Sequence, residues 1–182
     1  MSADASGARL VSTPRFLTAV ANRKSSRKAT WCSWTAVVTS RDTALTLVAR
    51  SSWESRPRQT EIWNLEKKAQ DAAFRAAKIG VPCEDVDAAA RKVLTDAGFG
   101  PEYKIPGLPH RTGHGIGLDG HEWVNLVRGN KMPLAPGMCF SNEPMIAIYG
   151  EFGVRLEDCM YITEQGARFF TTPSPAIDKP FA

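Results

Sequence analysis

The chain has 182 residues, of which 43% are hydrophobic and 23% charged, so it is long enough for one well-buried globular domain but short for two. No apolar run approaches the roughly 18–20 residues needed to span a bilayer, and the N-terminus lacks the apolar core of a secretory signal peptide. The four cysteines are scattered without C-x-x-C spacing, which is typical of reduced thiols. These features argue against a membrane-spanning or disulfide-stabilised protein and predict a cytoplasmic one.

The formal net charge of +4 hides an asymmetry between two parts of the chain. Residues 1–60 carry ten Lys/Arg and three Asp/Glu, a net charge of +7, whereas residues 61–182 carry thirteen and sixteen, a net charge of −3. Eighteen of the first sixty residues are Ser or Thr, and only two short apolar runs, Thr35–Val38 and Ala44–Ala49, could pass for strands. We therefore predict that residues 1–60 are an aberrant basic segment, disordered or frameshifted, ahead of a domain at residues 61–182.

From Glu61 onward the sequence predicts two helices. Apolar residues recur at spacings of three and four and form one stripe, made of Ile62, Leu65, Ala69, Ala72, Ala76 and Ile79. Gly80 and Pro82 end this helix, and a second helix runs from about Glu84 to Ala97. We interpret both helices as scaffold with no role in the chemistry.

Short β segments follow from Tyr103 to the end of the chain. The turn sequence L-A-P-G at 134–137 precedes a strand that carries Glu143. Further strands are predicted at Val154–Ile162 and Arg168–Thr171. Two helices followed by strands joined through tight turns predict an α+β fold.

All the histidines lie in one stretch. His110, His114 and His121 fall within residues 107–122, G-L-P-H-R-T-G-H-G-I-G-L-D-G-H-E, together with five glycines. Histidine binds divalent metals and transfers protons near neutral pH, and glycine allows close approach of a substrate. A Gly-rich surface loop would explain one histidine, but three within twelve residues favour a functional site.

Two glutamates lie in otherwise apolar, strand-like segments. Glu143 is part of M-C-F-S-N-E-P-M-I-A-I-Y and Glu157 of G-V-R-L-E-D-C-M-Y-I-T. An unpaired carboxylate there would be costly or would be neutralised by a change in its pKa. A bound cation would keep both ionised, but for Glu157 an ion pair with Arg155 on the same strand face explains the charge equally well.

The order H-x3-H-G-I-G-x3-H-E, then N-E-P, then V-R-L-E-D resembles the C-terminal catalytic half of the pita-bread metallopeptidases. These are the prolidases, aminopeptidases P, methionine aminopeptidases and creatinases. The resemblance covers about residues 61–175, and His110 together with Arg155 is more similar to the Xaa-Pro-cleaving branch than to methionine aminopeptidase. It implies a partial pita-bread fold, with two helices packed on a curved antiparallel sheet, and a hydrolase that cleaves the peptide bond before proline.

The resemblance also implies a role for each site residue. The metal ligands would be His114, Glu143 and Glu157, and the catalytic or substrate-handling residues would be His110, His121, Glu143 and Arg155. The cofactor would be two divalent metal ions, with manganese expected ahead of cobalt or zinc. The partner would be a peptide with proline after the scissile bond.

The chain departs from the family in its ligand set. The family holds its two ions with five protein ligands, and the remaining two are aspartates eleven residues apart on a hairpin ahead of the first helix. Residues 1–60 contain only Asp4 and Asp42, neither in a matching context. With three ligands of five, we predict that the chain as written is impaired or inactive.

A one-base shift of the reading frame would restore the missing aspartates. In the shifted frame Trp34-Thr35 must encode Asp, and Leu45-Thr46 encodes Asp if the leucine codon ends in G, eleven codons later. Across Asn22–Ala49, permissible codons spell P-Q-V-V-E-E-G-D-M-V-L-V-D-C-G and then A-G-Y-x-S-D-I-S-R, which resembles the missing family segment. We therefore favour a frameshifted segment over a genuine basic arm.

Two other classes of function stay open at this point. Some pita-bread relatives lack the metals and act as binding modules, and the +7 arm would suit a nucleic-acid binder whose affinity falls with salt. The retained histidines and glutamates argue against a metal-free binding module. The basic arm has no recognisable nucleic-acid-binding motif, so we rank nucleic-acid binding last. Without a native first half, the sheet would expose an edge and favour aggregation or a homodimer.

Overall fold

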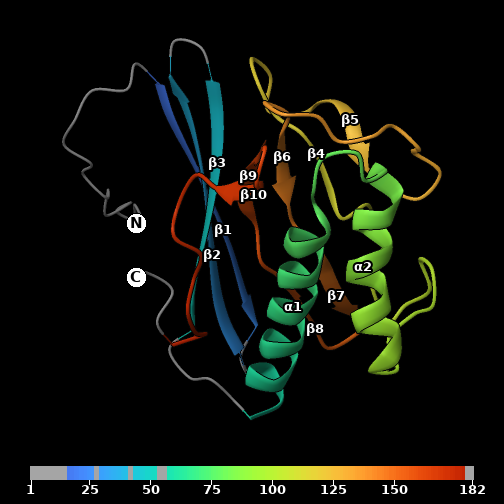
Figure 1. Cartoon of the computed structure of the whole chain (residues 1–182). Helices are drawn as coiled ribbons and strands as arrows, with labels where there is room; N and C mark the ends of the chain where they lie inside the picture. Colours follow the sequence, from blue (N-terminus) through green and yellow to red (C-terminus); the bar gives the residue numbers. More distant parts are fainter. Residues whose placement is uncertain (1–15, 27–28, 41–42, 53–56, 179–182) are drawn as a thin grey trace.

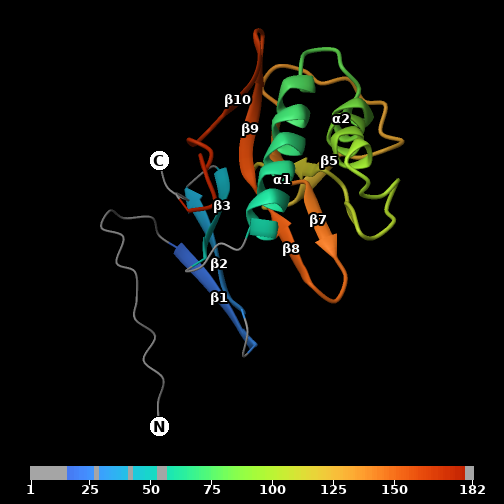
Figure 2. The same cartoon turned by 90° about the horizontal axis from the view of Figure 1, so that it is seen from below.

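The computed structural model describes residues 16–26, 29–40, 43–52 and 57–178 (Figure 1). Strands β1 (Phe16–Ser26), β2 (Ala29–Ser40) and β3 (Thr43–Ser52) pair antiparallel in that order. The apolar runs Thr35–Val38 and Ala44–Ala49 thus lie within β2 and β3. The β1–β3 sheet lies beside β9 (Asp158–Thr163) and β10 (Gly166–Phe169), as Figures 1 and 2 both show.

The two predicted helices are present with shifted ends. Helix α1 spans Pro57–Ala76 and begins before Glu61, because proline is well suited to the first turn of a helix. It ends before Ile79, which is 44% exposed and so is not part of the buried face as predicted. Helix α2 spans Cys83–Asp96, close to the predicted bounds.

The face that α1 buries is rotated relative to the predicted apolar stripe. Its buried residues follow a helical period of three and four but include polar side chains: Gln59, Ile62, Trp63, Glu66, Ala69, Gln70 and Ala73. Of the predicted stripe, Leu65, Ala72 and Ala76 are only half-buried. The buried Gln70 donates hydrogen bonds to Asn142 of β6 and Asp158 of β9.

Seven strands follow the helices and form two antiparallel sheets. The five-stranded sheet has the order β10-β9-β6-β4-β5, with β4 at Gly113–Gly115, β5 at Glu122–Leu126 and β6 at Cys139–Asn142. The two-stranded sheet pairs β7 (Met145–Ile148) with β8 (Phe152–Arg155). Two helices on antiparallel sheets confirm the predicted α+β class.

The prediction of a single strand over Val154–Ile162 is wrong, because the chain passes from one sheet to the other in the middle of this segment. Val154 belongs to β8 and Ile162 to β9, and Leu156 and Glu157 lie between these strands. Glu143 likewise lies between β6 and β7 rather than within a strand. Both glutamates therefore lie where the chain passes from one sheet to the other.

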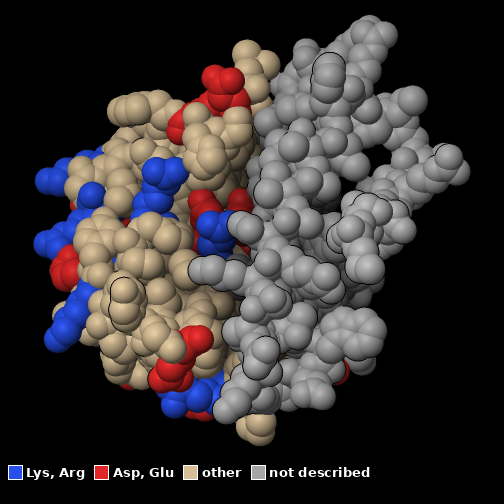
Figure 3. Space-filling view, turned by 180° about the vertical axis from the view of Figure 1, so that it is seen from behind, with Lys and Arg blue, Asp and Glu red and all other residues tan. Residues whose placement is uncertain are grey.

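The core is formed between the two helices and the strands behind them. Helices α1 and α2 lie side by side (Figure 2) and bury small residues against each other and against Leu126, Phe140, Ile146, Val154 and Met160. On the face seen in Figure 3, basic and acidic side chains are interspersed over the described residues. None of the helices in the described part of the chain is long and apolar enough to cross a membrane.

Candidate metal centre

His114 is held in the middle of β4 by hydrogen bonds on both its backbone and its ring. Its backbone N–H donates to Ser141 Oγ at 2.9 Å, and its ring Nδ1 lies 2.9 Å from the carbonyl oxygen of Gly115. Since a carbonyl only accepts, Nδ1 carries the proton and Nε2 points to the centre of the site. The residue is 3% exposed, so water does not compete for this orientation.

Close approach of β4 to β6 explains the glycine beside this histidine. A Cβ atom on Gly113 would lie 2.0 Å from the carbonyl oxygen of Ser141. Only glycine therefore fits at this position of β4. The register of β4 against β5 also shifts between His114 and Gly115, as at a β-bulge.

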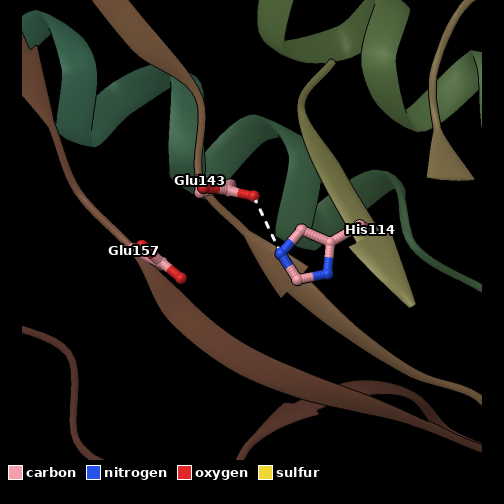
Figure 4. A group of neighbouring side chains, drawn as sticks. All are labelled: His114, Glu143 and Glu157. Carbon is pink, nitrogen blue, oxygen red and sulfur yellow. Dashed lines mark ion pairs between the residues drawn. The ribbon is translucent and has the colours of Figure 1, made fainter. Parts of the chain in front are cut away.

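His114, Glu143 and Glu157 converge from three different segments of the chain. Each offers a ligand atom, and these atoms all lie within 4.8 Å of one another (Figure 4). All three residues are buried, with Glu143 7% and Glu157 8% exposed. One imidazole nitrogen and two carboxylates form a donor set that suits Mn²⁺, Co²⁺ or Zn²⁺, so the residues present fit a divalent ion.

Ion pairs hold the same carboxylates. Glu143 Oε1 lies 3.2 Å from His114 Nε2, and Arg155 spans the two glutamates, 3.3 Å from Glu143 Oε2 and 3.1 Å from Glu157 Oε2. The predicted ion pair between Arg155 and Glu157 is thus present alongside the convergent donor atoms. The guanidinium offsets part of the repulsion between two buried carboxylates.

The pKa values of this cluster shift in opposite directions. Burial opposes ionisation of both partners, but the hydrogen bond between them and their mutual attraction outweigh it, which raises the pKa of His114 and lowers that of Glu143. Arg155 adds to the lowering for Glu143. His121, whose ring centroid lies 4.1 Å from that of His114, has a lowered pKa because the charge of His114 repels its proton and because it is partly desolvated.

A cavity of about 420 Å³ opens beside the cluster. His110, His121, Glu143 and Arg155 contribute to its lining, so the predicted catalytic residues share one cavity. His110 Nδ1 lies 2.6 Å from the carbonyl oxygen of Arg111, whereas its buried Nε2 has no hydrogen-bond partner among the described residues. An unsatisfied ring nitrogen at a cavity wall is available to a bound molecule.

Sequence reasoning missed a buried network that supports the site from α2. Asp87 is 1% exposed and its Oδ1 accepts hydrogen bonds from the backbone N–H of Thr112 at 3.1 Å and from the Thr112 hydroxyl at 2.7 Å. The Thr112 carbonyl in turn accepts the backbone N–H of Glu143 at 2.8 Å. Arg91, paired with Asp87 at 2.7 Å, donates to the His110 carbonyl at 2.6 Å. Helix α2 therefore supports the site through this network, and the i, i+4 spacing of Asp87 and Arg91 was the one feature that could have suggested the pair.

Comparison with known proteins identifies relatives of this chain. A sequence model of metallopeptidase family M24 matches residues 32–164, beginning upstream of the boundary predicted at residue 61. The Xaa-Pro dipeptidase of Lactobacillus helveticus is 48% identical over 114 residues, which are 63% of this chain and 30% of that protein. The probable dipeptidase PepE of Mycobacterium tuberculosis is 50% identical over 107 residues, 59% of this chain and 27% of that protein. The chain thus spans about a third of the length of the curated relatives it matches.

Solved structures agree with these sequence matches. The dipeptidase PepE of Mycobacterium ulcerans superimposes with a TM-score of 0.71 at 38% identity, covering 79% of this chain and 38% of that one. The Xaa-Pro dipeptidase of Bacillus anthracis gives a TM-score of 0.74 at 28% identity, covering 82% and 41%. The prolidase of Pyrococcus furiosus gives 0.71 at 30% identity, covering 79% and 42%. These matches confirm the predicted resemblance and the partial pita-bread fold.

Proposed function

The chain belongs to metallopeptidase family M24, and from that premise we propose that residues 61–182 are the C-terminal half of the catalytic domain of an Xaa-Pro peptidase. The reaction would be hydrolysis of the peptide bond before proline. The names of the relatives, Xaa-Pro dipeptidase and prolidase, support this substrate class. The active site of such a peptidase would hold two divalent ions, and manganese is the metal that we expect ahead of cobalt or zinc.

The convergence of three buried donor residues carries the proposal. His114, Glu143 and Glu157 would be the metal ligands contributed by this part of the chain, because their donor atoms lie within 4.8 Å of one another. A bound divalent ion lowers the pKa of a water molecule and polarises a carbonyl group. The Nδ1–H bond of His114 to a carbonyl keeps its Nε2 lone pair available to such an ion once the Nε2 proton is released.

The other residues of the cavity would handle protons and substrate. Glu143 would accept a proton from the attacking water and pass it to the leaving amine. His121 would donate a hydrogen bond to the developing oxyanion, and His110, whose Nδ1 donates to the Arg111 carbonyl, would accept one at Nε2 from that amine. Arg155, bonded to both glutamates, would hold their carboxylates in place.

Proline specificity would depend on the shape of the cavity. A peptide bond before proline has no N–H at the scissile nitrogen, and the proline ring fixes φ near −65°. The site can therefore recognise proline by the fit of its ring but not by a hydrogen bond to that nitrogen.

We further propose that residues 1–60 are a frameshifted version of the segment that carries two aspartate ligands in the family. The described part of that segment, β1–β3, contains no aspartate, since Asp4 and Asp42 lie outside the described residues. Sequencing the coding DNA across residues 10–60 tests this directly. A DNA sequence that cannot encode the two aspartates in the shifted frame would refute it.

Metal binding by the purified chain tests the proposed site. We expect isothermal titration with Mn²⁺ to detect one site, and His114→Ala and Glu157→Gln to abolish it, while Glu164→Gln at an exposed position leaves it unchanged. Absence of Mn²⁺, Co²⁺ and Zn²⁺ binding would refute the metal site and favour a non-catalytic binding module. Since the chain holds three of five family ligands, we expect little or no hydrolysis of an Ala-Pro dipeptide.

A further inference from the structure

Gln70 lies on α1, on the face that contacts the end of β6 just before Glu143 and the start of β9 just after Glu157. It is 0% exposed, and its side chain is among the largest that are fully buried. A buried primary amide must have its donors and acceptor satisfied, so its contacts define which groups it holds together.

The orientation of the Gln70 amide follows from its neighbours. Lys67 Nζ, which can only donate, lies 2.9 Å from Gln70 Oε1. The amide NH₂ therefore faces the sheet, where it donates to Asp158 Oδ2 at 2.8 Å and to the Asn142 carbonyl at 3.3 Å. Asn142 also donates a hydrogen bond from Nδ2 to the backbone carbonyl oxygen of Gln70 at 2.9 Å.

These contacts join the ends of β6 and β9 at one point. Asn142 and Asp158 are direct partners in the β6–β9 ladder, at the end of its register. Asn142 immediately precedes Glu143, and Asp158 immediately follows Glu157. A single amide on α1 thus donates to the backbone of the residue before Glu143 and to the side chain of the residue after Glu157.

We infer that Gln70 is a positioning residue that sets the separation of the Glu143 and Glu157 carboxylates for a divalent cation. The cation is part of the proposed function, on which this inference rests. Without the amide, Asp158 loses its hydrogen bond to α1 and Asn142 keeps only the bond from its Nδ2 to the Gln70 backbone, so the two chain segments that leave this pair are freer to separate. Groups that orient metal ligands commonly change metal affinity by about 10–100-fold when they are replaced.

The variant Gln70→Glu tests this with almost no change in shape. The new carboxylate still accepts from Lys67 but offers no donor to the Asn142 carbonyl and repels the Asp158 carboxylate. Asn64→Asp is the matched control, since it makes the same amide-to-acid change at an exposed position of the same helix. Gln70→Leu is a second variant, which removes the hydrogen bonds without adding charge.

Hydrogen–deuterium exchange of the metal-free chain is the first measurement. We expect Gln70→Glu and Gln70→Leu to speed backbone amide exchange about tenfold in residues 139–145 and 156–160, and to leave exchange in α2 unchanged. A tenfold change corresponds to about 1.4 kcal/mol, which is roughly the contribution of one hydrogen bond. Asn64→Asp should exchange like the parent chain. Equal exchange in the Gln70 variants and the control would overturn the inference.

Titration with Mn²⁺ is the second measurement. We expect both Gln70 variants to bind Mn²⁺ at least about 10-fold more weakly than the parent chain, and Asn64→Asp to bind within a factor of about two. Unchanged Mn²⁺ affinity in the Gln70 variants would refute the positioning role. If the parent chain binds no Mn²⁺ while exchange is faster in the Gln70 variants, the proposed function fails, whereas the role of Gln70 in fixing the two segments is supported.

Discussion

The buried pair Asp87–Arg91 offers a sharp test of how α2 supports the site, because α2 carries an exposed pair of the same geometry. Arg91 Nε lies 2.7 Å from Asp87 Oδ2, and Lys92 Nζ lies 2.7 Å from Asp96 Oδ2, both at i, i+4 spacing. The side chains of the first pair are 12% and 1% exposed, whereas those of the second are 74% and 63% exposed. The same Asp→Asn change can therefore be made at a buried and at an exposed ion pair of one helix.

The expected cost of Asp87→Asn follows from its hydrogen-bond partners. Asp87 accepts from Arg91, from both donors of Thr112 and from the backbone N–H of Arg128 at 3.2 Å. An asparagine amide would place its NH₂ against some of these donors and would leave the buried guanidinium without a counter-charge. Removing one partner of a buried pair typically costs about 3–5 kcal/mol, and the three carbonyls that Arg91 also contacts point to the lower end of that range.

Urea unfolding followed by circular dichroism measures the two costs. We expect Asp87→Asn to lower the free energy of unfolding by about 3 kcal/mol, a large part of the roughly 5–15 kcal/mol of a typical domain. Asp96→Asn should lower it by less than about 1 kcal/mol, because exposed pairs contribute little. Decreases in the free energy of unfolding that agree within about 1 kcal/mol would refute the inference that the buried Asp87 network stabilises the fold more than the exposed pair does.

Two further predictions concern β4. Gly113→Ala should destabilise the chain by about 1–3 kcal/mol or prevent folding, because its Cβ would lie 2.0 Å from the Ser141 carbonyl, while Gly120→Ala, with open space around it, should be neutral. Equal melting temperatures of these two variants would contradict the close approach of β4 and β6. In the metal-free chain, the stabilisation that protonated His114 gains from Glu143 is present below the unfolded histidine pKa of about 6.5 and is lost as pH rises through the raised folded pKa. The stability difference between the parent and Glu143→Gln should therefore shrink as pH rises through that range, and a difference that grows with pH in urea titrations would count against the pairing.

Local sequence patterns were sufficient to predict the helices but not the face they bury. Helical spacing of apolar residues predicted α1 and α2 within a few residues of their observed bounds. The buried face of α1 includes Glu66 and Gln70, which an apolar count assigns to solvent. Gln70 is buried because polar groups at the ends of β6 and β9 pack against the helix, and this tertiary contact leaves no trace in local periodicity.

The ends of the strands beside the two glutamates could not be predicted from the sequence either. The run from Val154 to Ile162 has the composition of one strand, yet it passes from β8 to β9 at Leu156 and Glu157. Composition reports strand preference and cannot show to which sheet each half pairs. The convergence of His114 with the glutamates was expected only through the family motif, since their sequence separation alone fixes no distance.

The positions of Glu143 and Glu157 also have a consequence for chain entropy. Strands β7 and β8 form a hairpin (Figure 1), and Glu143 lies just before β7 and Glu157 just after β8. An ion bound by both carboxylates would close the segment 143–157 into a loop, as a covalent crosslink does. Closing a loop of this length removes conformational freedom from the unfolded chain, by an amount that grows only slowly with loop length. The base of the hairpin would then be held together by the proposed ion, so that loss of the ion would loosen the fold around the site.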